Sequence, residues 1–190
     1  MKLLRKSKAL GTPVANLIIL VVVVMLSAVV TTFAISVTGN QAQKESLYLT
    51  KCNVWYKNST YSLVSLVIVN NGPTDVILSK ITIKGQDCPW NSTETYMLYN
   101  KTKNIVMANM PYVENVTNKG DEANKIKIGD AEFTFKVAGD DFVLQSGWTM
   151  LVYVVKPANI MIYDLGTPVR ITVATAQGVY CIETNVKAAS

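Results

Sequence analysis

The segment Leu17 to Val30 reads LIILVVVVMLSAVV, and Ser27 is its only polar residue. Polar residues stay sparse as far as Val37, so the apolar stretch has about the length that a membrane-spanning helix needs. A cleaved secretory signal has a shorter apolar core, of about 7 to 15 residues, followed by a small-residue cleavage site. Here the small residues Ala9 and Gly11 lie before the apolar stretch. The sequence therefore predicts that the chain keeps this hydrophobic helix.

The basic residues of the leader are expected to orient this helix. Positive charges before a hydrophobic helix keep that end of the chain in the cytoplasm and send the remainder across the membrane. The chain has 18 basic and 13 acidic residues, a net charge of +5, and removing the four leader charges leaves 14 against 13, or +1. The other lysines are scattered, so no phosphate-binding face and no nucleic-acid partner are expected. The leader charges are Lys2, Arg5, Lys6 and Lys8.

The composition favours a membrane-tethered protein with an exported part over a soluble enzyme. Hydrophobic residues make up 49% of the 190 residues, and charged residues make up only 16%. We expect the helix to continue through residue 45. Residues 46–190 are then long enough for one compact domain, and too short to suggest two.

From Ser46 onward the sequence pattern is typical of strands. Residues 47–56 and 62–69 are rich in β-branched and aromatic types, and the sequence Asn70-Asn71-Gly72-Pro73 then predicts a turn. Residues 86–129 are the least regular part, and we expect a long surface connection there.

Three further segments alternate apolar and polar residues, as strands with one buried face do. Residues 150–155 show no alternation, which predicts a central strand covered on both faces. The fold class that follows is α+β, with a long hydrophobic helix and then an antiparallel, immunoglobulin-like β-sandwich. In the alternating segments, Ile77, Ile81 and Ile83 face away from Lys80, Thr82 and Lys84; Phe133, Phe135 and Val137 from Glu132, Thr134 and Lys136; and Val169, Ile171 and Val173 from Arg170 and Thr172.

Four N-glycosylation sequons lie beyond the hydrophobic helix, in a region rich in Asn and Thr. A single sequon occurs easily by chance, but four on the predicted outer side favour N-linked glycans on at least one of them. The alternative is that these residues serve turns and the solvent-facing positions of strands. The acceptor residues are Asn58, Asn91, Asn100 and Asn115.

Three cysteines, Cys52, Cys88 and Cys181, lie in the segment that is predicted to be exported, where disulfides persist. Their odd number leaves at least one thiol unpaired. Cys88 lies in a predicted loop, and a bridge to either of the other two would staple that loop to a strand. The alternative is that all three are free thiols packed as small hydrophobic side chains.

Catalytic chemistry has little support in this sequence. The chain contains no histidine, which excludes Ser-His-Asp and Cys-His arrangements and an ordinary zinc site. Asp140 and Asp141 are adjacent acids but lack the ligand spacing of a calcium loop. Trp55, Trp90 and Trp148 could form a sugar-stacking surface, although anchors in a core or loop are the favoured interpretation. We therefore expect no enzyme, no metal and no cofactor.

The N-terminus carries a recognisable pattern in Lys8-Ala9, in Leu10-Gly11-Thr12-Pro13-Val14-Ala15-Asn16-Leu17, and in the β-branched apolar segment that follows. It resembles the N-terminus of archaeal type IV pilin-like proteins, the superfamily that also contains the archaeal flagellins. Members of this family commonly have a basic residue and Gly or Ala before a cleavage point, followed by a Leu-Ser-Pro-Val-Val-Ala-Thr-Leu-like start. The resemblance is confined to the N-terminal region.

The resemblance implies that a prepilin peptidase removes a class III signal leader on the cytoplasmic side. The implied cut lies between Ala9 and Leu10, so that residues 1–9 form the leader and residues 10–45 form the helix. A cut between Gly11 and Thr12 is the alternative. That second position would make Asn16 the fifth mature residue, where bacterial pilins carry glutamate.

The resemblance further implies a structural subunit of an extracellular pilus, used in adhesion and located on the cell surface. Its partners would be copies of itself, the membrane before assembly, the prepilin peptidase, an assembly ATPase and a platform protein. The alternatives are an archaellin-like subunit of a motility filament and a membrane-anchored surface protein that never polymerises. The helix residues expected in the filament core are Leu17, Ile18, Ile19, Leu20, Val21, Val22, Val23, Val24, Met25 and Leu26.

Overall fold

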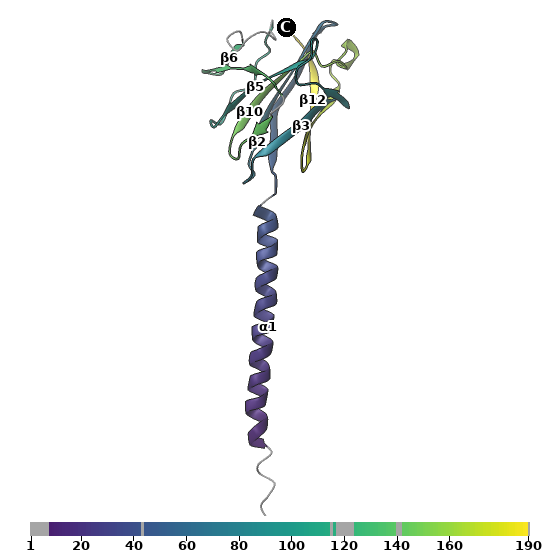
Figure 1. Ribbon diagram of the computed structural model, residues 1–190. Coiled ribbons are helices and arrows are strands. Elements are labelled where there is room, and N and C mark those ends of the chain that lie inside the picture. The colour runs from purple at the N-terminus through teal and green to yellow at the C-terminus, as the bar shows by residue number, and fades with distance from the viewer. Residues whose placement is uncertain (1–7, 43, 115, 117–123, 140–141, 190) are drawn as a thin grey trace, which may run out of the picture. The chain divides into compact units, whose positions relative to one another are not determined.

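The chain divides into two compact units, residues 1–43 and 44–190. The described residues of the first unit form a helix, and those of the second are mostly β (Figure 1). The computed structural model describes residues 8–42, 44–114, 116, 124–139 and 142–189.

The helix α1 spans Lys8–Ala42, and all its side chains from Pro13 to Gly39 are exposed within its unit. The same 27 residues contain no charged residue and have a mean hydropathy of 2.9. At 1.5 Å per residue they extend for about 40 Å, which exceeds the roughly 30 Å of a bilayer's hydrocarbon core. The helix ends before the predicted boundary at residue 45, because Glu45 belongs to the β unit.

A large curled sheet forms the β unit. Its strand order is β4-β3-β11-β12-β1-β2-β10-β5-β8, β9 pairs with β3, and β6 and β7 form a separate hairpin. The strands of the described residues are β1 (Leu47–Asn58), β2 (Tyr61–Asn70), β3 (Val76–Ile83), β4 (Gln86–Cys88), β5 (Tyr96–Thr102), β6 (Lys125–Ile128), β7 (Ala131–Thr134), β8 (Lys136–Val137), β9 (Val143–Leu144), β10 (Thr149–Val155), β11 (Pro168–Thr175) and β12 (Val179–Ala188), with a short 3-10 helix η2 at Ile162–Asp164.

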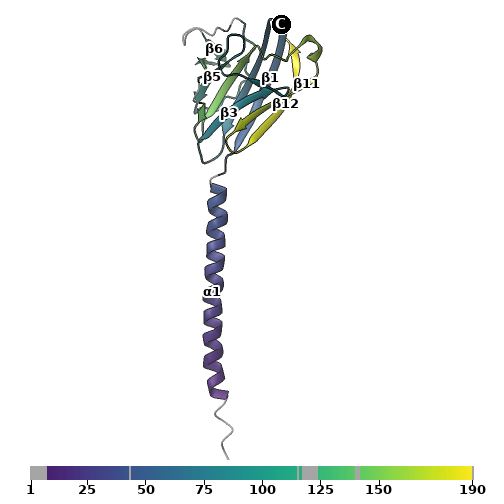
Figure 2. The same cartoon turned by 45° about the vertical axis from the view of Figure 1, so that its right-hand side comes forward.

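The curl of the sheet brings its two ends toward each other. β8 pairs with β5 near one end of the order, and the next strand in the chain, β9, pairs with β3 near the other end. The backbone N–H of Leu78 also donates to the carbonyl of Phe142 at 2.9 Å, just before β9. Figure 2 shows the strands wrapping around a common interior.

Two hydrophobic clusters fill the β unit, one on each face of its central strands. The first cluster lies inside the curl and joins β3, β11 and β12 to β1, β2, β10 and β5. The second lies on the opposite face of β2, β10 and β5, under the connection between β5 and β6. The unit can stand as one domain because both faces of its central strands are covered.

The predicted central strand at residues 150–155 is confirmed in β10. Met150, Val152 and Val154 pack in the first cluster, whereas Leu151 and Tyr153 pack in the second. A strand that is buried on both faces needs apolar residues at every position, which explains why its sequence does not alternate. The alternation predicted at residues 169–173 is also confirmed, since Val169, Ile171 and Val173 are buried.

The prediction of a purely antiparallel sheet is wrong for one pair of strands. β1 and β12 pair in parallel, with Val54 opposite Val186 and Tyr56 opposite Ala188. These are the first and last strands of the chain, and no local pattern in a sequence signals the direction of such a distant pairing.

The predicted facing of Ile77 is also wrong, because β3 contains an irregularity. Ala174 pairs with Lys80 and Thr175 pairs with Leu78, so Ser79 is an extra residue on β3. A bulge of this kind reverses the facing of the residues before it. As a result Val76 and Leu78 are buried while Ile77 is exposed, and Ile81 and Ile83 keep their predicted burial.

Residues 86–129, predicted to be irregular, contain the well-packed strand β5. It pairs with β10 along its whole length and with β8 at Leu98 and Tyr99. Its sequence, YMLYNKT, mixes apolar and polar types without a clear period, so the strand is specified by its neighbours in the sheet.

Candidate functional site

The surface of α1 is the most distinctive feature of this chain. The residues predicted for the filament core, Leu17 to Leu26, have between 45% and 65% of their surface exposed in the described structure. Exposed apolar side chains cover the whole circumference of the helix, with no polar face. A helix that is hydrophobic all round is stable only when lipid or other protein covers it.

Two hydroxyl groups in α1 are satisfied within the helix itself. Thr31 Oγ1 donates to the carbonyl of Ser27 at 2.7 Å, and Thr32 Oγ1 donates to the carbonyls of Ala28 at 3.0 Å and Val29 at 2.9 Å. An unpaired hydroxyl is costly in an apolar environment, whereas a hydroxyl bonded to its own helix is tolerated. The two threonines therefore do not prevent burial of the helix surface around them in lipid or protein.

The predicted cleavage region lies at the start of α1. The backbone from Lys8 onward is helical, while leader residues 1–7 lie outside the described residues. Pro13 is inside the helix. A proline has no N–H to donate to the carbonyl four residues earlier, and its ring crowds that carbonyl. The carbonyl deprived in this way belongs to Ala9, and it is part of the Ala9–Leu10 peptide bond.

Residues 44–46, the first residues of the β unit, are anchored to two turns of that unit. The side chain of Glu45 is buried and accepts a hydrogen bond from Thr175 Oγ1 at 2.5 Å. The Tyr180 hydroxyl donates to the carbonyl of Glu45 at 3.2 Å. The carbonyl of Ser46 accepts from the N–H groups of Asn71 and Gly72 at 2.9 and 3.1 Å.

Gly72 is required by this anchor. A Cβ atom at this position would lie 2.8 Å from the backbone nitrogen of Ser46 and 3.4 Å from the carbonyl oxygen of Lys44. Any side chain would push the anchored segment away from the turn. Sequence reasoning placed Gly72 in a turn but missed Glu45, because a buried acid in a polar segment leaves no pattern in the sequence.

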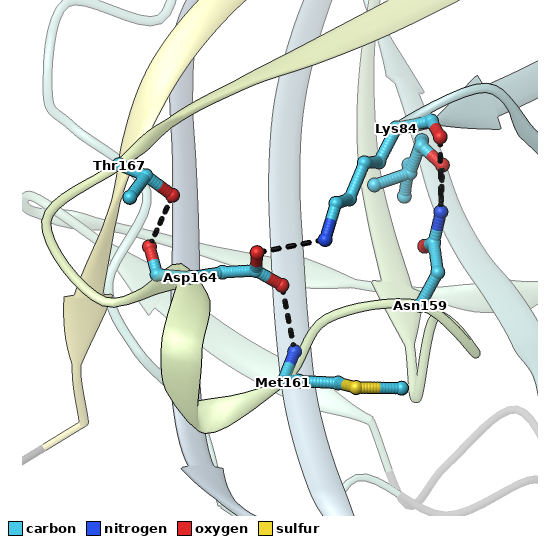
Figure 3. A network of polar contacts seen from close by, with 6 residues as sticks. Lys84, Asn159, Met161, Asp164 and Thr167 are labelled. Carbon is cyan, nitrogen blue, oxygen red and sulfur yellow. Dashed lines mark hydrogen bonds and ion pairs between the residues drawn. The ribbon is translucent and has the colours of Figure 1, made fainter.

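A second polar network closes the loop after β10 (Figure 3). The Asp164 side chain is 12% exposed, and its carboxylate accepts from Lys84 Nζ at 2.7 Å and from the Met161 N–H at 2.9 Å. These bonds hold the pKa of the Asp164 carboxyl below its usual range, with the Lys84 bond first in importance. Asn159 Nδ2 donates to the carbonyl of Ile83 at 2.6 Å. Since the carboxylate and the ammonium pair with each other, the network is a structural latch between β3 and the loop.

The three cysteines are free thiols in this structure. Cys88 is buried in the first hydrophobic cluster, Cys52 packs against that cluster, and Cys181 is exposed. Burial raises the pKa of the Cys52 thiol to about 12 and that of the Cys88 thiol to about 11. Both stay protonated at neutral pH and behave as small hydrophobic side chains.

The four predicted glycosylation sites differ in their surroundings. Asn58 is exposed at the end of β1, and Asn91 is exposed in the loop before β5. Asn100 is half-buried in β5, and its Nδ2 donates to the carbonyl of Thr134 at 2.8 Å. Asn115 lies outside the described residues.

The other candidate residues give no sign of a chemical site. Among the described residues no group of three or more Cys, Asp or Glu side chains could hold a metal ion, and Asp140 and Asp141 lie outside them. The tryptophans pack as core or loop anchors. Trp55 belongs to the second cluster, Trp90 stacks on Phe142 with ring centroids 4.5 Å apart, and Trp148 packs against the first cluster.

Comparison with known proteins adds no family to these observations. The chain matches no protein-family model, and no curated protein matches it.

Proposed function

We propose that this protein is a structural subunit of an extracellular, archaeal type IV pilus-like filament that polymerises through α1. The observation that carries the proposal is the uncharged helix Pro13–Gly39, with apolar side chains exposed around its whole surface. The bilayer stores the subunit before assembly, because a helix satisfies its backbone groups internally in lipid. In the filament, the helices of identical subunits replace the lipid.

Removal of the leader has a physical purpose in this proposal. The four leader charges can lie in the cytoplasm while the subunit spans the membrane, but a filament core cannot accommodate them unpaired. A prepilin peptidase that cuts after the leader releases a subunit whose N-terminal helix can be withdrawn from lipid. An assembly ATPase and a platform protein would supply and transmit the work of that withdrawal.

The position of Pro13 supports the cut between Ala9 and Leu10 over the cut between Gly11 and Thr12. A peptidase must bind its substrate backbone in a locally unwound form, with the carbonyl carbon accessible. Pro13 removes the helical hydrogen bond of the Ala9 carbonyl alone, and a proline in a helix interior costs about 3 kcal/mol. The helix is thus destabilised at the Ala9–Leu10 peptide bond, which is the bond that a cut between Ala9 and Leu10 would break.

The β unit is proposed to coat the outside of the filament. A head-to-tail interface that does not close generates an open helical polymer, and a chain with an apolar helix and a separately packed β unit suits this arrangement. We further infer that the two halves of the curled sheet act as an immunoglobulin-like sandwich. Strands from both halves contribute to the first hydrophobic cluster, which supports this finer description.

Adhesion is the proposed role of the filament, since the Pro13-containing start resembles adhesive pilins more than flagellins. A membrane-anchored surface protein that never polymerises is the second candidate, favoured by the length of α1, which exceeds the thickness of a bilayer core. In either case the chain acts by binding and not by catalysis.

Electron microscopy of material sheared from cells tests the proposal. Antibodies against residues 44–190 should decorate free filaments, and cells that lack the chain should have no decorated filaments. If the chain is recovered only in membranes after detergent extraction, the second candidate replaces the filament subunit.

A further inference from the structure

The sequon at Asn58 lies in the tight turn between β1 and β2. Asn58 pairs with Tyr61 across this turn, and Ser59 and Thr60 form its tip. All residues from Lys57 to Thr60 are exposed. The turn therefore presents the acceptor to solvent without opening any part of the sheet.

Hydrogen bonds within the turn orient the Asn58 side chain. Its Oδ1 accepts from the backbone N–H of Thr60 at 3.0 Å and from the Thr60 hydroxyl at 2.7 Å. With the amide oxygen held against the turn, Nδ2 is directed away from it. Within the described residues this Nδ2 makes no hydrogen bond, so no bond has to be broken before it enters a transferase, which must itself activate the amide nitrogen.

Asn100 offers the contrasting environment. It lies in β5 opposite Leu151 of β10, and its Nδ2 is already bonded to the carbonyl of Thr134. Entry of this side chain into a transferase would require β5 to leave its neighbours in the sheet, which costs several hydrogen bonds and buried apolar contacts. Asn91 is exposed, but its sequon lies in a loop tied by the bond from the Ser92 N–H to the Thr95 carbonyl at 2.9 Å.

A hollow of about 300 Å³ opens beside Asn58. Lys57 forms an ion pair with Glu114 there and holds the pKa of that carboxyl below its usual range, so both groups are charged at neutral pH. Ammonium and carboxylate groups donate to and accept from sugar hydroxyls. The hollow is lined by Lys57, Asn58, Thr60, Tyr61, Glu114 and Lys156.

We propose that, of the three acceptors that the structure describes, Asn58 is the principal N-glycan acceptor of the folded chain, and that the first sugar lies over this hollow. The donor is a lipid-linked oligosaccharide phosphate. A bond forms between Asn58 Nδ2 and C1 of the sugar while the bond between C1 and the phosphate oxygen breaks. Nδ2 gives one proton to a base of the transferase, and the phosphate leaves with the electron pair. This inference rests on the export of the β unit that the proposed function requires.

Peptide mapping of the chain recovered from the cell surface tests the inference. Trypsin cuts after Lys57 and Lys80, so peptide 58–80 carries Asn58 as its only sequon, whereas peptide 85–101 carries both Asn91 and Asn100. We expect a glycan mass on peptide 58–80, and fragmentation of peptide 85–101 should show Asn100 unmodified. A surface-exposed chain in which peptide 58–80 is bare, or Asn100 is modified as fully as Asn58, overturns the inference.

Matched variants separate modification from folding. Asn58→Asp keeps the oxygen that accepts from Thr60 but removes the amide nitrogen, so the intact mass should fall by one glycan. Thr60→Val should cause the same loss, while Thr60→Ser and Asn100→Asp should leave the glycan mass unchanged. An undiminished glycan mass in Asn58→Asp contradicts the inference.

The same preparation distinguishes failure of this inference from failure of the proposed function. Sheared filaments built from subunits with bare Asn58 would overturn the inference and leave the filament subunit intact. A chain that is glycosylated at Asn58 but found only in membranes would support the inference and overturn the filament.

Discussion

Pro13 affects the chain at one particular backbone atom, the carbonyl oxygen of Ala9. Pro13→Ala restores the missing helical hydrogen bond and adds up to about 3 kcal/mol to the local helix. Since each 1.4 kcal/mol is a factor of ten in rate, cleavage of the Ala9–Leu10 bond should slow by roughly ten- to a hundredfold. The measurement is the rate of leader removal in membranes that contain the peptidase.

A shifted proline provides the control for that experiment. The double variant Pro13→Ala with Ala15→Pro deprives the Gly11 carbonyl instead, so residual cleavage should move toward the Gly11–Thr12 bond. If Pro13→Ala is cleaved at the normal rate and position, Pro13 does not select the bond.

Asp164 makes the stability of the β unit sensitive to acid. Its pKa is lowered in the folded chain, chiefly by Lys84, relative to about 3.9 in an unfolded chain. The stabilisation is therefore complete above about pH 4 and is lost as the pH falls through the lower, folded pKa. In urea titrations of the full chain in detergent, Asp164→Asn should show a smaller loss of unfolding free energy between neutral pH and acid. An equal loss in Asp164→Asn and in the parent chain would show that other carboxylates account for it.

At the scale of the element, the proposed function requires α1 to suit two environments, the bilayer and the filament core. A single Lys near the middle of a membrane helix costs about 2.5 to 3.5 kcal/mol, which a span as apolar as this one tolerates. An unpaired charge in a packed helical core is not tolerated in the same way. We therefore expect Val24→Lys to remain in the membrane fraction and to form no filaments. Val24→Leu should be found both in the membrane fraction and in filaments.

Cell fractionation together with microscopy of sheared material measures both outcomes. Normal filaments from Val24→Lys would mean that this face of the helix stays outside the filament core.

The segment 44–46 is the first part of the β unit along the chain from α1, so in the proposed filament it would carry any load from α1 into that unit. Hydrogen bonds to a charged group contribute about 1.5 to 3 kcal/mol, so Glu45→Ala should lower the unfolding free energy of the full chain by an amount of that order. Thr175→Val should cost less once Glu45 is absent, since the two side chains bond to each other. Strictly additive losses in the double-mutant cycle would contradict this coupling.

The sequence predicted those elements that have a local pattern. The helix followed from a run of apolar residues, and β10 followed from an apolar stretch without alternation. The parallel pairing of β1 with β12 and the strand β5 could not be predicted, because both depend on partners distant in the chain. The exposure of Ile77 could not be predicted either, because it results from the bulge at Ser79, which forms where β3 pairs with a strand distant in the chain. The candidate residues of α1 were found from composition, whereas the roles of Pro13 and Glu45 needed backbone positions and burial.

At the scale of the whole molecule, the two units would divide the work of the proposed filament subunit. α1 has an apolar surface that requires a cover, and the β unit has its own two hydrophobic clusters. An interface made by α1 can therefore repeat along a polymer without disturbing the fold of the β unit. The proposed glycan at Asn58 would decorate the β unit.

The central claim is that the chain is processed at its N-terminus and polymerises through α1. Intact mass and N-terminal sequencing of protein sheared from the cell surface test it most directly. The account predicts membrane-free filaments whose subunits begin at Leu10, with any excess mass confined to the β unit. An uncut chain that begins at Met1 and occurs only in the membrane fraction would contradict it.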